Sequence, residues 1–383
     1  QVATAALAPT DITVPIRWLL RGQQNATVLM AEVQDIDPAR RIVIADGGQR
    51  EMPYDFLILA TGARHSYFGH PEWEAAAPGL KSIEDAIRLR QRILGAFEEA
   101  EKANDDATRG EWLTFVIVGA GPTGAEMAGM ISTIARGVKG AGYRRLEPTA
   151  ARVILVEGGA RVLSSFPEPL AAQARRDLEE LGVEVRTGST VTKVERRAVH
   201  IGEERLAART IVWAAGNAAS PLGASTGALL DRAGRVLVEP ELSVPSHPEL
   251  FVVGDLASVR CDGREVPGVA PAATQMGACA ARNVLHAIAG TPPTAFRYRN
   301  KGDLATIGRY RAIAHFGWGS FTGRLAWWLW LFVHILYLAG FRNRVTVLVQ
   351  WGYSFFTYQH GARLITARTM GGLQDRGQPS PPR

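Results

Sequence analysis

Several short apolar runs along the chain end in turns made of small residues. They read DFLILATGA at 55–63, FVIVGAGPTG at 115–124, ARVILVEGG at 151–159, RTIVWAAGN at 209–217 and LFVVGDLA at 250–257. Unbroken apolar runs of this length, bounded by glycine, are typical of strands buried in a parallel sheet. Together with the helices expected between them, they predict an α/β fold with two Rossmann-like dinucleotide-binding domains.

The run at 115–118 carries the strongest local signal. It leads directly into Gly119-x-Gly121-x-x-Gly124, and the residues that follow are predicted to form a helix. In such a motif the first glycine permits a tight turn, the second lets the backbone approach a pyrophosphate, and the helix N-terminus binds that anion. Because the motif stands between a strand and a helix, a dinucleotide site is favoured over a purely structural turn.

An acidic residue ends the next predicted strand. Glu157 can accept hydrogen bonds from both hydroxyls of an adenine ribose, and it would repel a 2′-phosphate, which favours NADH over NADPH. Its separation from the glycine loop exceeds the usual ~20 residues, because residues 137–150 read as an insertion. Arg161 is near enough to hold a phosphate, so the expected preference for NADH is not absolute.

The order of these parts predicts one domain inserted in another. RTIVWAAGN repeats the pattern of DFLILATGA and closes the domain that Gly119 opens. DFLILATGA precedes that opening, so it closes a different nucleotide domain, whose own strand and glycine loop are expected upstream of Gln1. In a two-nucleotide flavoenzyme, Asp255 of LFVVGDLA lies beside the ribityl chain and the flavin-side phosphate. Residues 1–383 alone are therefore expected to bind NADH weakly and to retain little FAD.

Composition and charge change this picture mainly at the end of the chain. The net charge is +6, and the segment from Phe321 onward contains seven arginines but a single acid, Asp375. Five of the nine tryptophans also lie near this end, and arginine with tryptophan favours a lipid interface over a nucleic acid. The two cysteines and eight histidines show neither a disulfide framework nor metal-ligand spacing. We therefore expect a reducing compartment and no metal.

Two apolar segments near the end predict contact with a membrane. Residues 325–339 are apolar on all sides except at His334, but they are fewer than the ~20 residues that span a bilayer. In residues 345–361, polar positions recur every three or four residues, at Thr346, Gln350, Ser354 and Thr357. A monotopic anchor in the membrane interface is favoured, with a buried dimer interface or a re-entrant hairpin as alternatives.

These motifs together resemble a known family. The chain is similar to the type II NADH dehydrogenases, which are non-proton-pumping NADH:quinone oxidoreductases among the flavoproteins with two dinucleotide-binding domains. The pieces that carry the resemblance are QVATAALAP, YDFLILATGARHSYFGH, VIVGAGPTGAEMAG, ILVEGGARVL, VWAAGN, LFVVGDLA, APAATQMGACAARN and LFVHILYLAGFRNRVTVLVQWGYSFFTYQHGARLIT. The chain departs from the family in lacking the N-terminal flavin loop and in having Pro271 where a glutamine is often seen.

The resemblance implies a relay from NADH to FAD and then to a membrane quinone, at the cytoplasmic face of the cell membrane. A homodimer is compatible with it. The resemblance also implies catalytic roles for Glu126, near the flavin and nicotinamide, and for Gln275, in the quinone pocket. The alternative for Glu126 is that the dipole at the first turn of its helix favours an acid there. The alternative for Gln275 is that it is an ordinary exposed helix residue. The cofactor-binding residues that the resemblance implies are Ala60, Thr61, Gly62, Gly119, Gly121, Gly124, Glu157, Ala215, Gly216, Gly254, Asp255 and Ala273.

Five segments follow from these expectations. They are the first part of the FAD domain (1–110, incomplete at its N-terminus), the NADH domain (111–220), the second part of the FAD domain with the quinone-site segment (221–318), membrane-anchoring helices (319–368) and a disordered tail (369–383). Two other functions remain open. One is a soluble flavin reductase for a protein acceptor such as a ferredoxin, which would have no use for apolar terminal helices. The other is a non-catalytic NADH-binding fragment.

Overall fold

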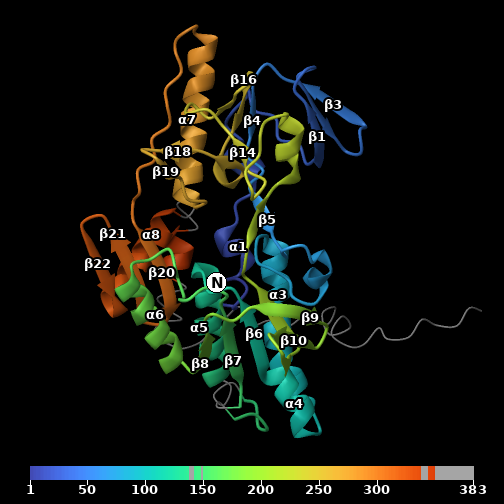
Figure 1. Ribbon diagram of the computed structural model, residues 1–383, viewed down its shortest axis with the longest axis vertical. Coiled ribbons are helices and arrows are strands. Elements are labelled where there is room, and N and C mark those ends of the chain that lie inside the picture. Colours follow the sequence, from blue (N-terminus) through green and yellow to red (C-terminus); the bar gives the residue numbers. More distant parts are fainter. Residues whose placement is uncertain (138–141, 148–149, 338–343, 350–383) are drawn as a thin grey trace, which may run out of the picture. The chain divides into compact units, whose positions relative to one another are not determined.

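The described chain forms two compact units. The computed structural model describes residues 1–137, 142–147, 150–337 and 344–349 (Figure 1). The first unit contains Gln1–Arg21, the described residues of Tyr67–Ala215 and those from Gly302 onward, and the second contains Gly22–Ser66 and Gly216–Lys301. Each unit has its own cluster of buried apolar side chains. Helices and strands alternate as the sequence predicts, and the α/β fold class is confirmed.

A four-stranded parallel sheet forms the centre of the first unit. Its order is β12-β6-β7-β8, and its strands are β6 (Thr114–Val118), β7 (Arg152–Val156), β8 (Val183–Arg186) and β12 (Thr210–Trp213). Helix α5 (Pro122–Arg136) joins β6 to β7, and α6 (Glu168–Glu180) joins β7 to β8 (Figure 1). Every residue of β6 is buried, as expected for an apolar run in a sheet whose two faces are both covered.

Smaller elements surround this sheet within the first unit. Two antiparallel sheets have the orders β11-β10-β9 and β20-β21-β22. Their strands are β9 (Val191–Glu195), β10 (Ala198–Ile201), β11 (Glu204–Ala207), β20 (Asp303–Gly308), β21 (Arg311–Phe316) and β22 (Gly319–Thr322). The helices are α1 (Pro9–Ile12), α2 (Ile16–Leu19), η1 (Pro71–Ala75), α3 (Ile83–Lys102), α4 (Asp106–Leu113) and α8 (Gly323–Tyr337).

Helix α5 packs very closely on β20. A Cβ added at Gly129 would lie 1.6 Å from the carbonyl oxygen of Ile307, so only glycine permits this approach. Sheet β20-β21-β22 is in turn packed against α8, through the buried side chains of Ala312, Ala314 and Ala326. The segment after residue 302 is therefore part of the same unit as the glycine loop.

The second unit is built on β4 (Leu57–Leu59) and β16 (His247–Val252), which pair in parallel. Helix α7 (Ala270–Ile288) packs against them through Met276, Cys279 and Ala280. The other strands are β1 (Val33–Asp37), β2 (Ile42–Ala45), β3 (Arg50–Pro53), β5 (Ala63–His65), β13 (Asn217–Ala219), β14 (Val236–Leu237), β15 (Ser243–Val244), β17 (Ala257–Ser258), β18 (Arg260–Cys261) and β19 (Arg264–Glu265). Two short 3₁₀ helices are η3 (Pro221–Thr226) and η4 (Gly254–Leu256).

The two similar stretches of sequence have similar structures. Each is a strand followed by a glycine in the left-handed conformation, with φ of +65° at Gly62 after β4 and +72° at Gly216 after β12. The strands that follow these turns, β5 and β13, pair with each other in antiparallel fashion. The repeat seen in the sequence is thus a repeat of strand and turn.

The predicted nucleotide-binding segments were defined by ligand, whereas the compact units are defined by packing. Residues 67–110, predicted within the FAD part, belong to the unit that holds the glycine loop. The predicted insertion at 137–150 packs on α3 where it is described, because the Tyr143 hydroxyl donates a hydrogen bond to Glu98 (2.7 Å). The assignment of segments to FAD and NADH stays a prediction.

Candidate functional site

The three glycines of the loop after β6 differ in their surroundings. Gly119 has a φ of +99°, and a Cβ there would lie 2.7 Å from backbone atoms of Ala214 and Ala215. A Cβ on Gly124 would lie 1.8 Å from the carbonyl oxygen of Gly119. At Gly121, by contrast, a Cβ would meet no described atom within 4 Å. Close packing therefore requires Gly119 and Gly124, whereas Gly121 leaves the backbone open to a ligand.

Helix α5 presents its N-terminus at this loop. The helix begins at Pro122 with Gly121 as its N-cap, and the described side chains leave its first N–H groups uncapped. Uncapped N–H groups and the helix dipole favour an anion at this position. The loop and the helix start thus fit the pyrophosphate of a dinucleotide.

Glu157 directly follows β7 and reaches back to the loop. Its Oε2 accepts a hydrogen bond from the Ala120 N–H (2.7 Å), and its Oε1 accepts one from the Gly159 N–H (2.8 Å). The side chain is half-buried, and each carboxylate oxygen has a further lone pair. A carboxylate held in this way can still accept hydrogen bonds from two ribose hydroxyls.

The turn after β12 lies against the same loop. β12 pairs in parallel with β6, and the Ala214 N–H donates a hydrogen bond to the Val118 carbonyl (2.7 Å). The backbone of Ala215 follows beside Gly119. Ligands of doubly wound sheets bind at the carboxyl ends of the strands, and the structure brings Gly119, Gly121, Glu157 and Ala215 to this edge.

In the second unit, the predicted residues gather at the carboxyl ends of β4 and β16. Because these strands are parallel neighbours, residues 60–62 and 254–255 follow adjacent strand ends. A Cβ at Gly62 would meet no described atom within 4 Å. A Cβ at Gly254, whose φ is +69°, would lie 3.3 Å from the Cβ of Ala273 on α7. This edge therefore resembles the edge at β6 and β12, with an open glycine and a tightly packed one.

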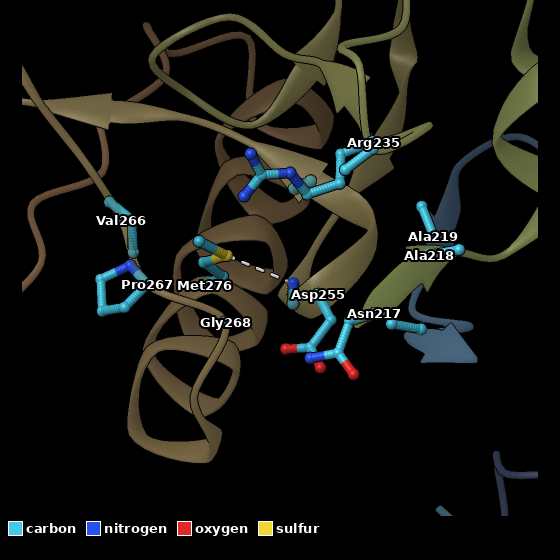
Figure 2. Close-up of a pocket in the computed structure, with 13 residues that line it drawn as sticks. Asn217, Ala218, Ala219, Arg235, Asp255, Val266, Pro267, Gly268 and Met276 are labelled. Carbon is cyan, nitrogen blue, oxygen red and sulfur yellow. Dashed lines mark hydrogen bonds between the residues drawn. The ribbon is translucent and has the colours of Figure 1, made fainter. Parts of the chain in front are cut away.

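A cavity of about 180 Å³ opens beside Asp255 (Figure 2). Figure 2 shows the Asp255 carboxylate and the Asn217 amide pointing into the same space. Drug-sized ligands occupy pockets of ~300–1,000 Å³, so this cavity suits part of a nucleotide and not the whole. Polar oxygen and amide groups beside the open backbone at Gly62 suit the hydroxyls and phosphate of a flavin nucleotide, so these residues fit FAD.

Most residues of this cavity were missed in the sequence, among them Asn217, Arg235 and Met276. Asn217 directly follows the second small-residue turn, and that position could have been singled out. Arg235 belongs to no recognisable motif, and Met276 lies in APAATQMGACAARN, where the resemblance implied roles only for Ala273 and Gln275. The sulfur of Met276 accepts a hydrogen bond from the Gly254 N–H (3.2 Å), which fixes the start of the turn that carries Asp255.

Helix α8 exposes an apolar face. Leu325, Trp328, Phe332 and Leu336 follow one another at helical spacing, and their exposed fractions are 55%, 51%, 60% and 48%. Ala326 and Trp330, on another face, are buried. Among the described residues, no helix is both long and apolar enough to cross a membrane. Most of the second predicted anchor segment, from residue 350 onward, lies outside the described residues.

Comparisons with known proteins agree along the chain. Residues 3–277 match the pyridine nucleotide-disulphide oxidoreductase family, and residues 300–358 match the NDH2 C-terminal domain. The chain is 44% identical to the type II NADH:quinone oxidoreductase NdhA of Mycobacterium tuberculosis, over 96% of this chain and 81% of that protein. It is 41% identical, with the same coverage, to the enzyme Ndh of that organism. This chain belongs to the type II NADH:quinone oxidoreductases.

A solved structure agrees with this family in fold. NDH2 from Plasmodium falciparum in complex with NADH superimposes with a TM-score of 0.83, covering 93% of this chain and 90% of that one, at 18% identity. The sulfide:quinone oxidoreductase of Aquifex aeolicus superimposes with a TM-score of 0.68, over 86% of this chain and 78% of that one, at 17% identity. At these identities the likeness concerns the fold alone.

The structure corrects the predicted position of Glu126 in this type II enzyme. Helix α5 starts at Pro122, so Glu126 lies on its second turn and not on the first. The favourable effect of a helix N-terminus on an acid is confined to the first turn. The alternative explanation of Glu126 as a helix-start acid is therefore wrong, and its predicted catalytic role stays a prediction.

Gln275 has more partners than an ordinary exposed helix residue. It is half-buried on α7, its Oε1 accepts from the Arg299 N–H (3.0 Å), and its Nε2 donates to the carbonyls of Arg299 and Pro271 (3.1 Å each). The amide thus ties α7 to the extended segment before β20. A quinone carbonyl would have to replace one of these two acceptors, because an amide has only two N–H donors.

Proposed function

We propose that this protein oxidises NADH and transfers two electrons through a bound FAD to a quinone, without pumping protons. The observation that carries this proposal is the glycine loop at the end of β6, with Gly121 open and Glu157 fixed beside it. It occurs in a chain that aligns over 96% of its length with a type II NADH:quinone oxidoreductase. A bound FAD would supply the two-electron chemistry between the nucleotide and the quinone.

The residues of the chain bind and orient the reactants. The loop from Gly119 to Gly124 and the start of α5 hold the NADH pyrophosphate, and Glu157 holds the adenine ribose. Ala60, Thr61, Gly62, Gly254, Asp255 and Ala273 hold FAD, and Ala215 and Gly216 form the turn that closes the NADH domain. Asn217 joins the FAD set because its amide lines the same cavity as Asp255.

The electron-transfer end involves two further residues. Glu126 is half-buried on α5, two residues beyond the glycine motif, and we assign it to the flavin and nicotinamide. To bind a quinone carbonyl, one N–H of the Gln275 amide gives up its hydrogen bond to the Arg299 carbonyl and donates to the quinone. The bond to Arg299 is an exposed one, so it is the easier of the two to replace. Both assignments predict loss of quinone reduction without loss of NADH binding when either side chain is truncated.

Helix α8 supplies the contact with the membrane. Its exposed leucine and aromatic side chains form an apolar face, and Arg324 lies at its start. Apolar residues flanked by cations are typical of helices lying in a bilayer interface. We place this contact at the cytoplasmic face of the cell membrane, where NADH and a membrane-dissolved quinone meet.

The proposal is tested with the purified protein, NADH and a short-chain ubiquinone analogue. After incubation with excess FAD, we expect absorbance bands of bound flavin, their bleaching by NADH, and their return when the quinone is added. Bleaching without reoxidation by quinone, but with reoxidation by an added ferredoxin, would instead support a soluble reductase for a protein acceptor. Absence of flavin bands after incubation with FAD would support the non-catalytic alternative.

A further inference from the structure

The carboxylate of Glu157 is fixed by backbone amides from two different segments of the chain. The Ala120 N–H belongs to the glycine loop and the Gly159 N–H to the turn after β7, and each binds a different carboxylate oxygen (2.7 and 2.8 Å). Hydrogen bonds from backbone amides to a carboxylate are stronger than those between neutral groups. The two contacts therefore set the direction in which the remaining lone pairs point.

The carboxylate leaves little room for a side chain at position 159. A Cβ on Gly159 would lie 3.1 Å from Glu157 Oε1, which is closer than an ordinary van der Waals contact. The backbone of Gly159 is not in the left-handed region, so alanine would not strain the chain there. The carboxylate is the obstacle to a larger residue at this position.

The backbone around Gly159 has little freedom to move away. The Gly159 carbonyl accepts a hydrogen bond from the Gly188 N–H (2.8 Å), and the Glu157 carbonyl accepts one from the Ser189 N–H (2.9 Å). The Glu157 N–H donates to the Arg186 carbonyl at the end of β8 (2.8 Å). An added methyl group at Gly159 would therefore displace the Glu157 side chain and not the turn.

We propose that Gly159 is a positioning residue for nucleotide specificity: by having no side chain, it keeps the Glu157 carboxylate where it accepts the adenine-ribose hydroxyls and repels a 2′-phosphate. This rests on the proposed role of Glu157 in NADH binding. A ribose diol needs both oxygens of the carboxylate at hydrogen-bond distance, whereas a phosphorylated ribose is disfavoured by the same negative charge. Displacing the carboxylate therefore weakens both the hydrogen bonds to the ribose hydroxyls and the repulsion of a 2′-phosphate.

The test replaces Gly159 by alanine and measures binding of NAD⁺ and NADP⁺ by calorimetric titration. We expect Gly159→Ala to weaken NAD⁺ binding about tenfold, the effect of one lost hydrogen bond to a charged group. Binding of NADP⁺ should be unchanged or tighter, so the dissociation constant for NADP⁺ divided by that for NAD⁺ becomes smaller. Equal weakening of both nucleotides, or no change in either, would overturn the proposal.

The neighbouring glycine provides a matched control. A Cβ on Gly158 would lie 3.7 Å from Thr190 Oγ1, an ordinary contact, and Gly158 is likewise outside the left-handed region. Gly158→Ala should therefore leave both dissociation constants unchanged. Thermal unfolding of the two variants should match the wild type, which shows that the effect of Gly159→Ala is not a loss of fold. A Gly158→Ala variant that narrows the ratio as much would contradict a specific role for Gly159.

Glu157→Gln separates this inference from the function on which it rests. If Glu157 recognises the ribose, its neutral replacement narrows the ratio of NADP⁺ to NAD⁺ dissociation constants. Glu157→Gln without effect would refute the ribose assignment itself. Glu157→Gln with an effect, but Gly159→Ala without one, would refute only the positioning role of Gly159.

Discussion

At the scale of single residues, the three glycines of the loop after β6 have different roles. Gly119 and Gly124 have no room for a side chain, because backbone atoms lie 2.7 and 1.8 Å from where a Cβ would stand. Gly121 has room, with φ of −69° at the start of α5. Stability therefore depends on the two packed glycines and ligand access on the open one.

This difference predicts that two alanine substitutions differ in their effect on the free energy of unfolding. Gly124→Ala should lower the free energy of unfolding by about 2–3 kcal/mol, because overpacking forces the backbone of the loop to shift. Gly121→Ala should change the free energy of unfolding by less than about 0.5 kcal/mol, because the added methyl group meets no described atom within 4 Å and the backbone is unstrained. Urea denaturation measures both values.

NAD⁺ binding should respond in the folded Gly121→Ala variant. The added methyl group occupies the space through which a pyrophosphate approaches the backbone, so we expect the dissociation constant to rise by at least about tenfold, the cost of one lost hydrogen bond to an anion. Unaltered NAD⁺ binding by Gly121→Ala would show that the nucleotide does not lie over this loop.

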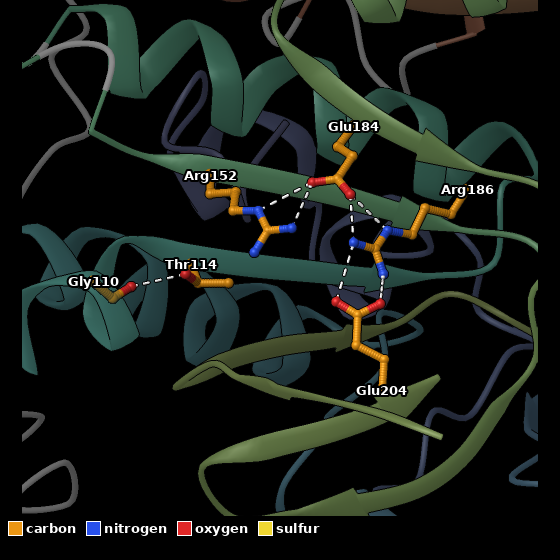
Figure 3. A network of polar contacts seen from close by, with 6 residues as sticks. All are labelled: Gly110, Thr114, Arg152, Glu184, Arg186 and Glu204. Atoms are coloured by element: carbon orange, nitrogen blue, oxygen red, sulfur yellow. Dashed lines mark hydrogen bonds and ion pairs between the residues drawn. The ribbon is translucent and has the colours of Figure 1, made fainter. Parts of the chain in front are cut away.

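At the scale of elements, ion pairs join three strands of the first unit (Figure 3). Arg152 on β7 donates to Glu184 on β8 (2.9 Å), and Arg186 on β8 donates to Glu184 (2.6 Å) and to Glu204 on β11 (2.6 Å). Burial by itself would raise the pKa of Glu184, but hydrogen bonds and charge from Arg186 and Arg152 lower it below the ordinary value. The ionised form of Glu184 is therefore favoured in the folded state.

Glu184→Gln should lower the free energy of unfolding at pH 7 by about 1 kcal/mol, the upper value for partly exposed pairs. A carboxylate with a lowered pKa stabilises the fold above its unfolded pKa, about 4.3 for Glu. That contribution is lost as the pH falls through the lower pKa of the folded state. The difference between wild type and variant should therefore shrink in acid, as measured by urea unfolding at pH 7 and at about pH 3.5.

A single ion pair on α6 serves as the control. Glu179 pairs only with Arg175 among the described ion pairs, one helical turn away, at 2.8 Å. Glu179→Gln should cost no more than about 0.5 kcal/mol, as exposed i,i+4 pairs do. Equal losses for the two variants would show that the contacts of Glu184 do not act as a network.

At the scale of the whole molecule, the apolar face of α8 predicts attachment to membranes. The protein should sediment with vesicles containing anionic lipid, and detergent should release it. Salt at about 1 M, where the Debye length is about 3 Å, should release it poorly, because apolar burial is not screened. Sedimentation assays on the purified protein measure this directly.

Charge on the exposed face of α8 should abolish the attachment. Trp328→Asp combined with Phe332→Asp places two acids on that face, whereas the control Leu229→Asp alters an apolar side chain that is 78% exposed in the second unit. We expect only the α8 variant to stay in the supernatant. Release of both variants, or of neither, would indicate that another surface holds the protein to lipid.

The local motifs of the sequence by themselves determined much of the site. The run at 115–118 became the inner strand β6, because a strand whose sheet is covered on both faces buries side chains on both, here Phe115 and Ile117 in one cluster and Val116 and Val118 in another. The sequence also showed the three spaced glycines, the acid after the next strand and the repeated small-residue turn. Backbone conformation restricts the residue type at the glycines, and ribose recognition restricts it at the acid. The class of fold follows from these short-range constraints, and the resemblance to the family rests on the same motifs.

The tertiary structure decided what depends on residues far apart in the chain. Gly129 is required by β20, which begins at Asp303, and Gln275 is tied to the backbone at Arg299. Asn217, Arg235 and Met276 reach one cavity from three separate segments. No sequence period encodes such meetings, because packing between distant segments arises only once strands and helices have assembled. The tight space at Gly159 also depends on a distant residue, because the Ala120 N–H helps to hold the Glu157 carboxylate, and a Cβ added at Gly159 would lie 3.1 Å from that carboxylate.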